Sequence, residues 1–338
     1  MALAVSAQRS MEAVHPILTE EGQLVVFDRR SWQSRELAKR LTADQPWPAG
    51  AEFAKALAAN GLDRDTPPAT IPIPARIASG VYLVGQDRVS NLTYMIDCGP
   101  EGVAIIDPTY ESEVERTVAN VEKCGRSRKD IRWVLNTHCH VDHAMADFKF
   151  RELGARILIH EMDATHVERG TQVTGAYLVA AQTGRRDFPV SKVDHRLVDG
   201  EELRLGNKRM AVIHTPGHTP GSASFLMQAD GKNLLFSGDT VLYDYRLGWQ
   251  GNPYADNRAY AESLAKLSRF ALDGTPVRFD LLLPGHGCMS MTKAYLDVQK
   301  AREQVQADVA AGRDIRAAPF SNPDYRTKMS GRPVSPYR

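Results

Sequence analysis

The chain has 338 residues, of which 43% are hydrophobic and 25% are charged, a composition that excludes an intrinsically disordered protein. Its length allows one large domain with extensions, or two domains. The 42 Lys and Arg residues nearly balance the 41 Asp and Glu residues, and the formal net charge of +1 argues against binding to nucleic acid or to an anionic membrane surface.

Residues 1–75 are expected to form an N-terminal helical extension and a proline-rich connector. The segments "SWQSRELAKRLTA" and "GAEFAKALAANG" carry apolar residues at helical spacing. The segment "DTPPATIPIPA" at 65–75 holds four prolines, which block both a helix and a central strand. A homodimer formed through this extension is one hypothesis, and a lid over a groove in the main domain is another.

The main domain is expected at residues 76–312, followed by an irregular tail at 313–338. Strands and helices alternate in two successive halves, and two mixed sheets packed together and flanked by helices accommodate this order. We expect strands at 80–85, 91–99, 102–108, 131–137, 155–160, 201–206, 208–215, 222–228, 232–239 and 279–287. We expect helices at 110–125, 144–154, 161–168, 257–272 and 292–311, and an irregular stretch at 170–195.

The segment "NTHCHVDHA" at 136–144 concentrates three of the ten histidines of the chain. It follows an apolar strand, at the sheet edge where α/β proteins usually bind ligands. In an extended segment the side chains of His138, His140 and Asp142 point the same way, and the two residues between them face elsewhere. His143 then begins a helical turn. One short loop thus offers ligands to two neighbouring metal positions.

Histidine and aspartate without thiolate are typical of a catalytic metal site, whereas structural zinc sites usually contain several cysteines. The alternative, histidines that only cap a helix, is disfavoured by how rarely this pattern arises by chance. Three later segments, "VIHTPGHTPGS", "LLFSGDT" and "LLLPGHG", repeat one arrangement of apolar strand, small-residue turn and ligand-type side chain. They add His218, Asp239 and His286 to the candidate ligands.

The segments "THCHVDH", "TPGHTPGS", "SGDT" and "PGHG", in this order, resemble the metallo-β-lactamase superfamily over residues 78–300. The resemblance implies an α/β fold, a four-layer αββα sandwich, with two metals in a groove at one sheet edge. It implies two Zn²⁺ per chain, with iron or manganese as alternatives. By position, it implies that His138, His140 and His218 hold the first metal, that Asp142, His143 and His286 hold the second, and that Asp239 bridges them.

This ligand set predicts hydrolysis. A bridging carboxylate offsets the repulsion of two cations about 3.5–4 Å apart, and metal coordination lowers the pKa of water from ~15.7 to about 7. The resulting metal-bound hydroxide is a nucleophile at neutral pH, and one cation can polarise the attacked carbonyl. Asp142 is also a candidate catalytic residue that orients this water or accepts its proton.

Residues 240–256 are the expected substrate-binding loop. They include Tyr243, Tyr245, Arg246 and Trp249, which could clamp an apolar body carrying a carbonyl, nitrile or carboxylate group. Tyr243 is the preferred catalytic donor to the carbonyl or oxyanion. The alternative is that these aromatic side chains only pack the loop against the domain.

The sequence lacks motifs that are typical of some members of the superfamily, and their reactions are therefore less expected. Glyoxalase II and persulfide dioxygenases usually carry a Gly-Cys-Gly-Arg-like segment after the bridging Asp, and this chain has "TVLYDYRLGWQG" there. The "TPGHTPGS" and "IHEMDA" segments resemble quorum-quenching lactonases and non-cysteine β-lactamases. Diiron oxygen reductases of this fold have a glutamate in the first motif, which is absent here.

We therefore expect a metal-dependent hydrolase of a small molecule with a carbonyl-type centre, such as an ester, thioester or lactone. The alternative is attack on another electrophile, either a β-lactam or an activated aryl halide. A nuclease, a phosphodiesterase or a persulfide dioxygenase is less favoured. Four scattered cysteines indicate reduced thiols, and neither a signal peptide nor a membrane span is evident, so the cytoplasm is the expected location.

Overall fold

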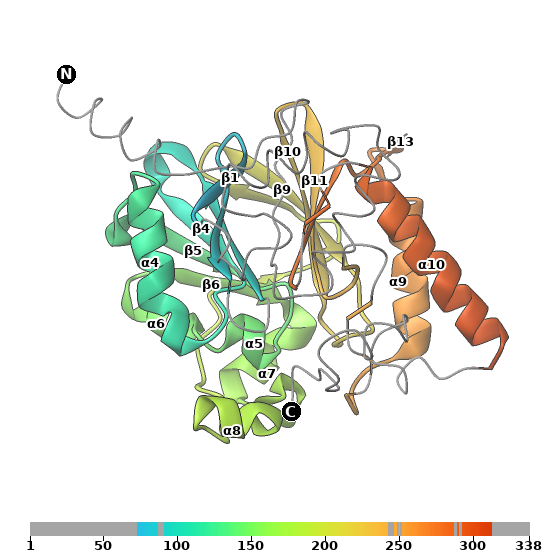
Figure 1. Ribbon diagram of the computed structural model, residues 1–338, viewed down its shortest axis with the longest axis horizontal. Helices are drawn as coiled ribbons and strands as arrows, with labels where there is room; N and C mark the ends of the chain where they lie inside the picture. The colour runs from blue at the N-terminus through green and yellow to red at the C-terminus, as the bar shows by residue number, and fades with distance from the viewer. Residues whose placement is uncertain are drawn as a thin grey trace, which may run out of the picture.

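The computed structural model describes residues 73–86, 91–242, 247–248, 250, 252–286, 289–290 and 293–312. The expected helices of the N-terminal extension and the tail at 313–338 lie outside these residues. Two sheets stand face to face with helices against their outer surfaces, which gives four layers from one side of the molecule to the other (Figure 1).

The first sheet has seven strands in chain order. Strands β1 to β4 are antiparallel neighbours, and β4 to β7 run parallel. The strands are β1 Ala75–Ala78, β2 Val81–Gln86, β3 Leu92–Asp97, β4 Val103–Ile106, β5 Ile131–Leu135, β6 Arg156–His160 and β7 His195–Leu197. The parallel half places the carboxyl ends of β4, β5 and β6 at one edge.

The second sheet has five strands in the order β14-β11-β10-β9-β8. Its pairs are antiparallel, except that β14 runs parallel to β11. The strands are β8 Glu202–Leu205, β9 Lys208–His214, β10 Ala223–Ala229, β11 Lys232–Gly238 and β14 Leu281–Pro284. A small hairpin, β12 Ala271–Leu272 with β13 Thr275–Pro276, precedes the last of them.

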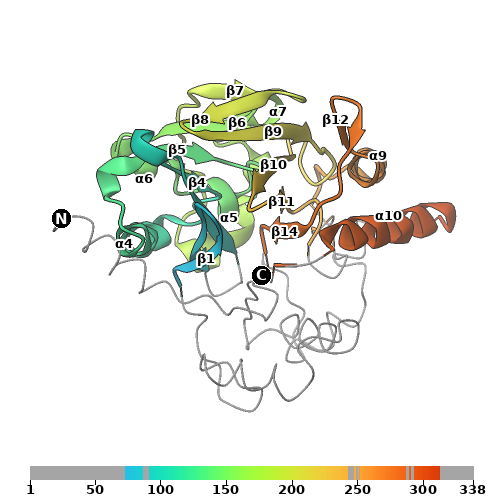
Figure 2. The same cartoon turned by 90° about the horizontal axis from the view of Figure 1, so that it is seen from above.

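The longer helices cover the outer faces of the sheets (Figure 2). Helices α4 Val114–Lys123 and α6 Asp147–Glu152 lie on the first sheet, and α9 Asn257–Ser268 and α10 Ala294–Ala310 lie on the second. Short helices near the sheet edge are α5 Val141–Ala144, α7 Glu161–Arg169 and α8 Ala180–Thr183. Single 3₁₀ turns are η1 Gly99–Glu101, η2 Glu111–Glu113, η3 Arg128–Asp130, η4 Gln172–Thr174 and η5 Ala176–Val179.

Successive residues of a strand face opposite sides of its sheet, so they pack into different layers of the molecule. In β3, Tyr94 faces the core between the sheets, whereas Met95 faces the helices on the first sheet. Tyr94 meets Phe236 of the second sheet edge to face, with ring centroids 5.4 Å apart. The outer helix α9 buries Tyr260 and Leu264, four residues apart, against the second sheet. This arrangement confirms the αββα sandwich.

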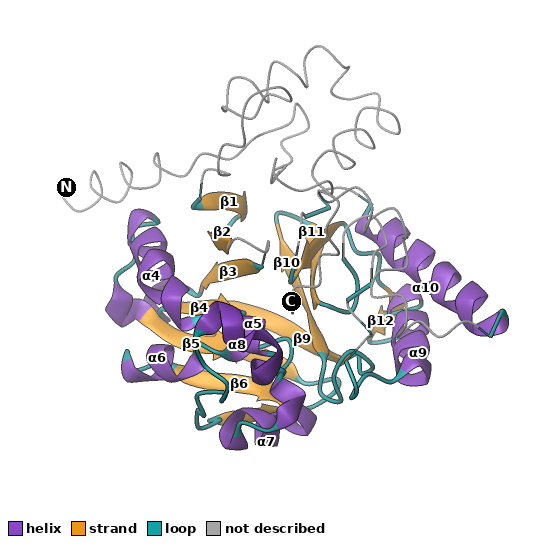
Figure 3. Cartoon of the chain, turned by 60° about the horizontal axis from the view of Figure 1, so that its bottom comes forward, coloured by secondary structure: helices purple, strands orange, loops and turns teal. Residues whose placement is uncertain are grey.

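Some elements differ from the sequence prediction (Figure 3). The helix expected at 144–154 begins earlier and divides into α5 and α6. The stretch at 170–195 contains η4, η5 and α8 rather than an irregular loop, and β7 was not predicted because three residues carry too little pattern. Among the described residues, no helix is long and apolar enough to span a membrane.

Candidate metal centre

The histidine-rich loop follows β5 and passes directly into α5. Because α5 begins at Val141, Asp142 and His143 lie in its first turn, whereas His138 and His140 lie in the loop before it. The extended alternation expected from the sequence therefore ends before Asp142. The helical turn brings this aspartate to the side of the cluster instead.

Three further side chains approach from the second sheet. His218 lies in the loop after β9, Asp239 follows the last residue of β11, and His286 lies two residues beyond β14. Because β11 and β14 are parallel neighbours, with Gly238 paired with Pro284, their carboxyl ends meet at one edge. The structure thus gathers all seven side chains that the sequence analysis proposes as metal ligands.

The candidate ligand atoms fall into three overlapping groups, and the atoms within each group lie within 4.8 Å of one another. The groups are His138, His140 and His218; Asp142, His143 and His286; and His138, His143 and Asp239. Asp239 Oδ2 lies 3.4 Å from His218 Nε2 and 3.2 Å from His286 Nε2. Its carboxylate therefore lies between the first two groups.

Several polar atoms in this cluster are buried without a hydrogen-bond partner among the described residues. They are both carboxylate oxygens of Asp142, Oδ1 of Asp239 and Nε2 of His218. Asp142 and His218 are 0% exposed, and burying a carboxylate without a partner is unfavourable. A divalent cation would satisfy these atoms, and imidazoles with carboxylates are ligands for zinc, iron and manganese. The residues present therefore fit a metal centre.

The histidines of the first group favour their neutral form, which is the form that binds a metal. Burial, followed by the neighbouring imidazoles, lowers the pKa of His138 and of His140 well below the usual value. Burial also lowers the pKa of His218, although the carboxylate of Asp239 opposes this change.

The second group differs because carboxylates surround its histidines. Burial lowers the pKa of His143, but the carboxylates around it, led by that of Asp142, outweigh burial and raise the pKa to about 10. Burial likewise opposes protonation of His286, and Asp239 reverses the balance, so its pKa is raised. Without a metal, His143 therefore carries a proton at pH 7.

This difference predicts two steps of proton release when zinc is added to chelator-treated protein in weak buffer. Zinc at the first group displaces few protons from ligands, whereas zinc at the second group displaces more, led by the proton of His143, and the raised pKa of His286 adds to the release. Binding at the second group therefore weakens as the pH falls below about 10. A pH indicator would follow the protons during the titration, and equal release in both steps would contradict the assignment.

Asp107, which the sequence analysis did not single out, supports the cluster from behind. It follows β4, and its Oδ1 accepts a hydrogen bond from the Thr137 backbone N–H at 2.8 Å. Its Oδ2 accepts from Thr137 Oγ1 at 2.8 Å and lies 3.0 Å from His143 Nδ1. The carboxylate thereby keeps a proton on His143 Nδ1, so the proton that a metal displaces is the one on Nε2. The strand-then-aspartate pattern in "GVAIIDP" was the available signal.

Replacing Asp107 with asparagine is expected to weaken zinc binding at the second group by roughly 10- to 100-fold, since the amide holds the His143 ring less firmly. Competition with a coloured chelator measures this affinity. Asp273→Asn, an exposed position in the β12–β13 turn, is the matched control and leaves the affinity unchanged. An unchanged affinity in Asp107→Asn would show that Asp107 does not position His143.

A second buried carboxylate, Asp163 of α7, joins two of the ligand loops. Its Oδ2 accepts from the Cys139 backbone N–H at 2.8 Å and from Thr219 Oγ1 at 2.7 Å, and its Oδ1 accepts from the Gly221 backbone N–H at 2.6 Å. Gly221 is required there because a Cβ would lie 2.4 Å from the Asp163 backbone nitrogen. Asp163 therefore fixes the loop of His138 and His140 against the loop of His218.

The residues predicted to contact substrate, Tyr243, Tyr245, Arg246 and Trp249, lie outside the described residues. The same expected loop contributes Gln250, whose Nε2 lies 3.4 Å from His218 Nδ1 and donates to the Gly248 carbonyl at 3.2 Å. Gln250 is buried and was not among the sequence-predicted site residues. Its position beside a candidate ligand indicates that this loop reaches the metal centre.

A small recess opens beside His140. Val173, Leu178 and Pro253 contribute apolar atoms to its wall, and the exposed rings of Tyr177 and Tyr254 border it. The hydroxyl of Tyr254 donates to Gln172 Oε1 at 3.2 Å, which joins the 172–178 segment to the loop after Asn252. The first of these segments belongs to the stretch at 170–195, which the sequence also allows as a long loop beside the active site.

Comparisons with known proteins agree with this geometry. The family model described as the metallo-beta-lactamase superfamily matches residues 87–286, which is more than half of the chain. A probable metallo-hydrolase of Methanocaldococcus jannaschii is 31% identical over 186 residues, which cover 54% of this chain and 82% of that protein. The acyl-coenzyme A thioesterase MBLAC2 of Bos taurus is 29% identical over 221 residues, which cover 62% of this chain and 72% of that protein.

Solved structures show the same similarity. A metallo-beta-lactamase from Cronobacter sakazakii superposes with a TM-score of 0.55 and 25% sequence identity, over 70% of this chain and 94% of its own. A subclass B3 metallo-beta-lactamase of Bradyrhizobium japonicum superposes with a TM-score of 0.56 over 72% of this chain and 95% of its own. Its sequence identity of 21% supports the shared fold alone.

Proposed function

The chain belongs to the metallo-beta-lactamase superfamily and is a metallo-hydrolase, and from this premise we propose that it uses two zinc ions per chain to hydrolyse a small molecule at a carbonyl-type centre. Esters, thioesters and lactones are the proposed substrate class. The observation that carries the proposal is the position of Asp239, between a group of three histidines and a group of one aspartate and two histidines.

In this proposal, His138, His140 and His218 hold one metal, and Asp142, His143 and His286 hold the other, with Asp239 shared. Divalent cations, when bound, supply Lewis acidity that activates water and polarises a carbonyl group. Asp107 keeps the His143 ring oriented through the contact at Nδ1.

Asp142 has a further proposed role in proton transfer. Both of its carboxylate oxygens are buried and accept no hydrogen bond from the described residues. Its backbone carbonyl accepts from the side chain of Asn91 at 3.2 Å, which helps to fix the start of α5. An oxygen not used in coordination is therefore positioned to orient the attacking water or to accept its proton. Tyr243 remains the proposed donor to the carbonyl oxygen.

Two comparisons guide the choice of substrate. The thioesterase relative supports thioesters within the carbonyl class, and the superposed β-lactamases make a β-lactam the second candidate. Hydrolytic dehalogenation of an activated aryl halide is kept as a further alternative. We propose that Tyr243, Tyr245, Arg246 and Trp249 contact the substrate. Tyr177 and Tyr254, which border the recess beside His140, are further candidates to contact the substrate.

Assembly and location are part of the proposal. A homodimer through residues 1–75 rests on the helical pattern of that segment alone. The cytoplasm is supported by Cys98, Cys124 and Cys139, which are buried free thiols and form no disulfide among the described residues. Removing residues 1–70 and measuring the mass in solution tests the dimer, and an unchanged dimer mass would exclude this interface.

The test of function is acid release in weak buffer by zinc-loaded protein and by a chelator-treated control. The panel contains aryl esters, acyl-coenzyme A and glutathione thioesters, acyl-homoserine lactones, β-lactams and a chlorinated aromatic nitrile. We expect turnover of one ester, thioester or lactone class that chelation abolishes and zinc restores. Turnover of β-lactams or aryl halides alone would replace the carbonyl proposal with its alternative, and no turnover with zinc bound would contradict hydrolysis of any class tested.

A further inference from the structure

A cavity of about 240 Å³ lies between α9, α10 and the segment at 277–279 that leads into β14. None of its lining residues belongs to the metal cluster. The two helices lie on the outer face of the second sheet (Figure 2), whereas the cluster lies in the loops after β5, β9, β11 and β14. The cavity is thus a second candidate site, independent of the proposed reaction.

The floor of this cavity is apolar. The side chains of Leu267, Phe279 and Val298 are each 1% exposed and belong to the core between α9, α10 and the second sheet. Val277 and Tyr295 extend this surface toward solvent. These floor side chains are already buried, so a ligand seated there gains packing contacts with them rather than a large hydrophobic burial.

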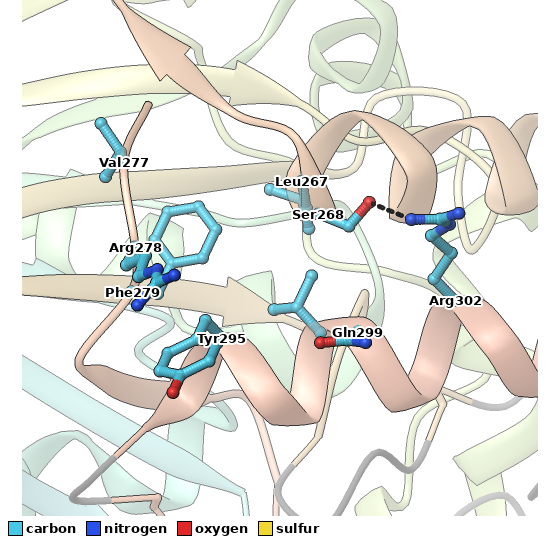
Figure 4. A pocket seen from close by; sticks show the side chains of 9 residues that line it. Leu267, Ser268, Val277, Arg278, Phe279, Tyr295, Gln299 and Arg302 are labelled. Carbon is cyan, nitrogen blue, oxygen red and sulfur yellow. Dashed lines mark hydrogen bonds between the residues drawn. The ribbon is translucent and has the colours of Figure 1, made fainter. Parts of the chain in front are cut away.

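Two arginines border the cavity at separate positions (Figure 4). Arg302 is half-buried, and its Nη1 donates to Ser268 Oγ at 3.3 Å. Its Nε is buried and donates to no acceptor among the described residues, and it pairs with no carboxylate there. A half-buried guanidinium with an unused donor is unfavourable until an anion supplies the missing partner.

The other arginine is exposed to solvent. Arg278 lies over the Tyr295 ring, 5.2 Å from the centroid, and forms no ion pair within the part of the chain that the structure describes. The carboxylate of Glu303 belongs to the residue next to Arg302, but its Oε1 accepts from Gln299 Nε2 at 2.9 Å. The rim of the cavity therefore presents two guanidinium groups without a paired carboxylate.

We propose that this cavity binds a small organic acid, with its body against the floor and its carboxylate on the guanidinium of Arg302, while Arg278 adds positive charge at the other end of the cavity. Guanidinium groups match carboxylates through parallel N–H donors, and the ring under Arg278 keeps that group in place. The volume is below the ~300 Å³ at which pockets for drug-sized ligands begin, so the ligand is small. A phosphate ester would present similar oxygens and is distinguished by the test.

The test is isothermal titration of zinc-loaded, full-length protein with sodium benzoate, benzyl alcohol and inorganic phosphate. We expect benzoate to bind and the neutral alcohol of the same shape to bind at least about 10-fold more weakly. Stronger binding of phosphate than of benzoate would overturn the choice of a carboxylate on an apolar body.

Matched variants test whether benzoate binds in this cavity. Arg302→Met keeps the apolar stem and is expected to weaken benzoate binding by about 10-fold, and Arg278→Gln, at an exposed position, weakens it in the same direction. Arg258→Gln, at the opposite end of α9 and paired with Glu262, leaves it unchanged. If both cavity variants bind benzoate like the parent, or if benzoate only competes with the hydrolysed substrate, the site is the metal centre and the proposal is wrong.

Discussion

Replacing Asp239 with asparagine is expected to remove most of the hydrolytic activity, on the order of 100-fold or more, and to lower the bound zinc from two ions per chain toward one. The carboxylate of Asp239 lies between His218 and His286, within 3.4 Å of an imidazole nitrogen of each. An amide carries no charge, so it offsets less of the repulsion between two cations. Metal analysis of the dialysed protein and steady-state kinetics provide the two measurements.

The chain offers a matched control for this variant. Asp273→Asn makes the same chemical change at an exposed turn and should alter neither zinc content nor kcat/KM. Because Asp239 is 4% exposed, circular dichroism should verify that the variant is folded before its activity is compared. Retention of two zinc ions with full activity in folded Asp239→Asn would show that Asp239 is not shared between the metals.

Replacing Gly285 with alanine is the second large effect expected. A Cβ at this position would lie 2.5 Å from Asp239 Oδ1 and 2.6 Å from His143 Cε1, and no Cβ in a folded protein approaches other atoms so closely. The added methyl group must displace the two candidate ligands, and a displacement of about 1 Å lowers catalytic rates by on the order of 100-fold. We expect reduced kcat and weaker binding of the second zinc ion, measured by kinetics and by chelator competition.

A second glycine separates this effect from a general effect of alanine. Gly231 lies in the turn between β10 and β11, and a Cβ there meets nothing within 4 Å. Gly231→Ala introduces strain through its positive φ of 69°, worth about 1–2 kcal/mol, but touches no candidate ligand. Its stability should fall while zinc binding and kcat stay unchanged. Equal activity in the two alanine variants would mean that Gly285 has no role in the ligand geometry.

The candidate ligands could be predicted from the sequence because each follows an apolar strand. Strands of one edge bring such residues together whatever the detailed register, so His218, Asp239 and His286 were identifiable from local patterns. The geometric reason for predicting Asp142 as a ligand is partly wrong. An extended segment was expected to align it with the histidines, but the helix begins at Val141 and brings it into the cluster by a helical turn.

Asp107 and Asp163 could not be ranked from the sequence, because their roles depend on partners that are distant along the chain. Asp107 contacts Thr137 and His143, which are 30 and 36 residues away, and Asp163 binds Gly221, 58 residues away. A strand-end aspartate and an aspartate in a helix are common, and only the fold shows which backbone donors they meet. The arginine-lined cavity is likewise a product of helix packing, since α9 and α10 form it together.

We propose that hydrolysis requires two metals held by the seven clustered side chains. The most direct measurement is the rate of substrate hydrolysis as zinc is added back to metal-free protein, with bound zinc counted at each point. Activity is expected to rise mainly with the second zinc ion and to become constant at two ions per chain. Full activity with one ion, or activity that does not depend on zinc, would contradict it.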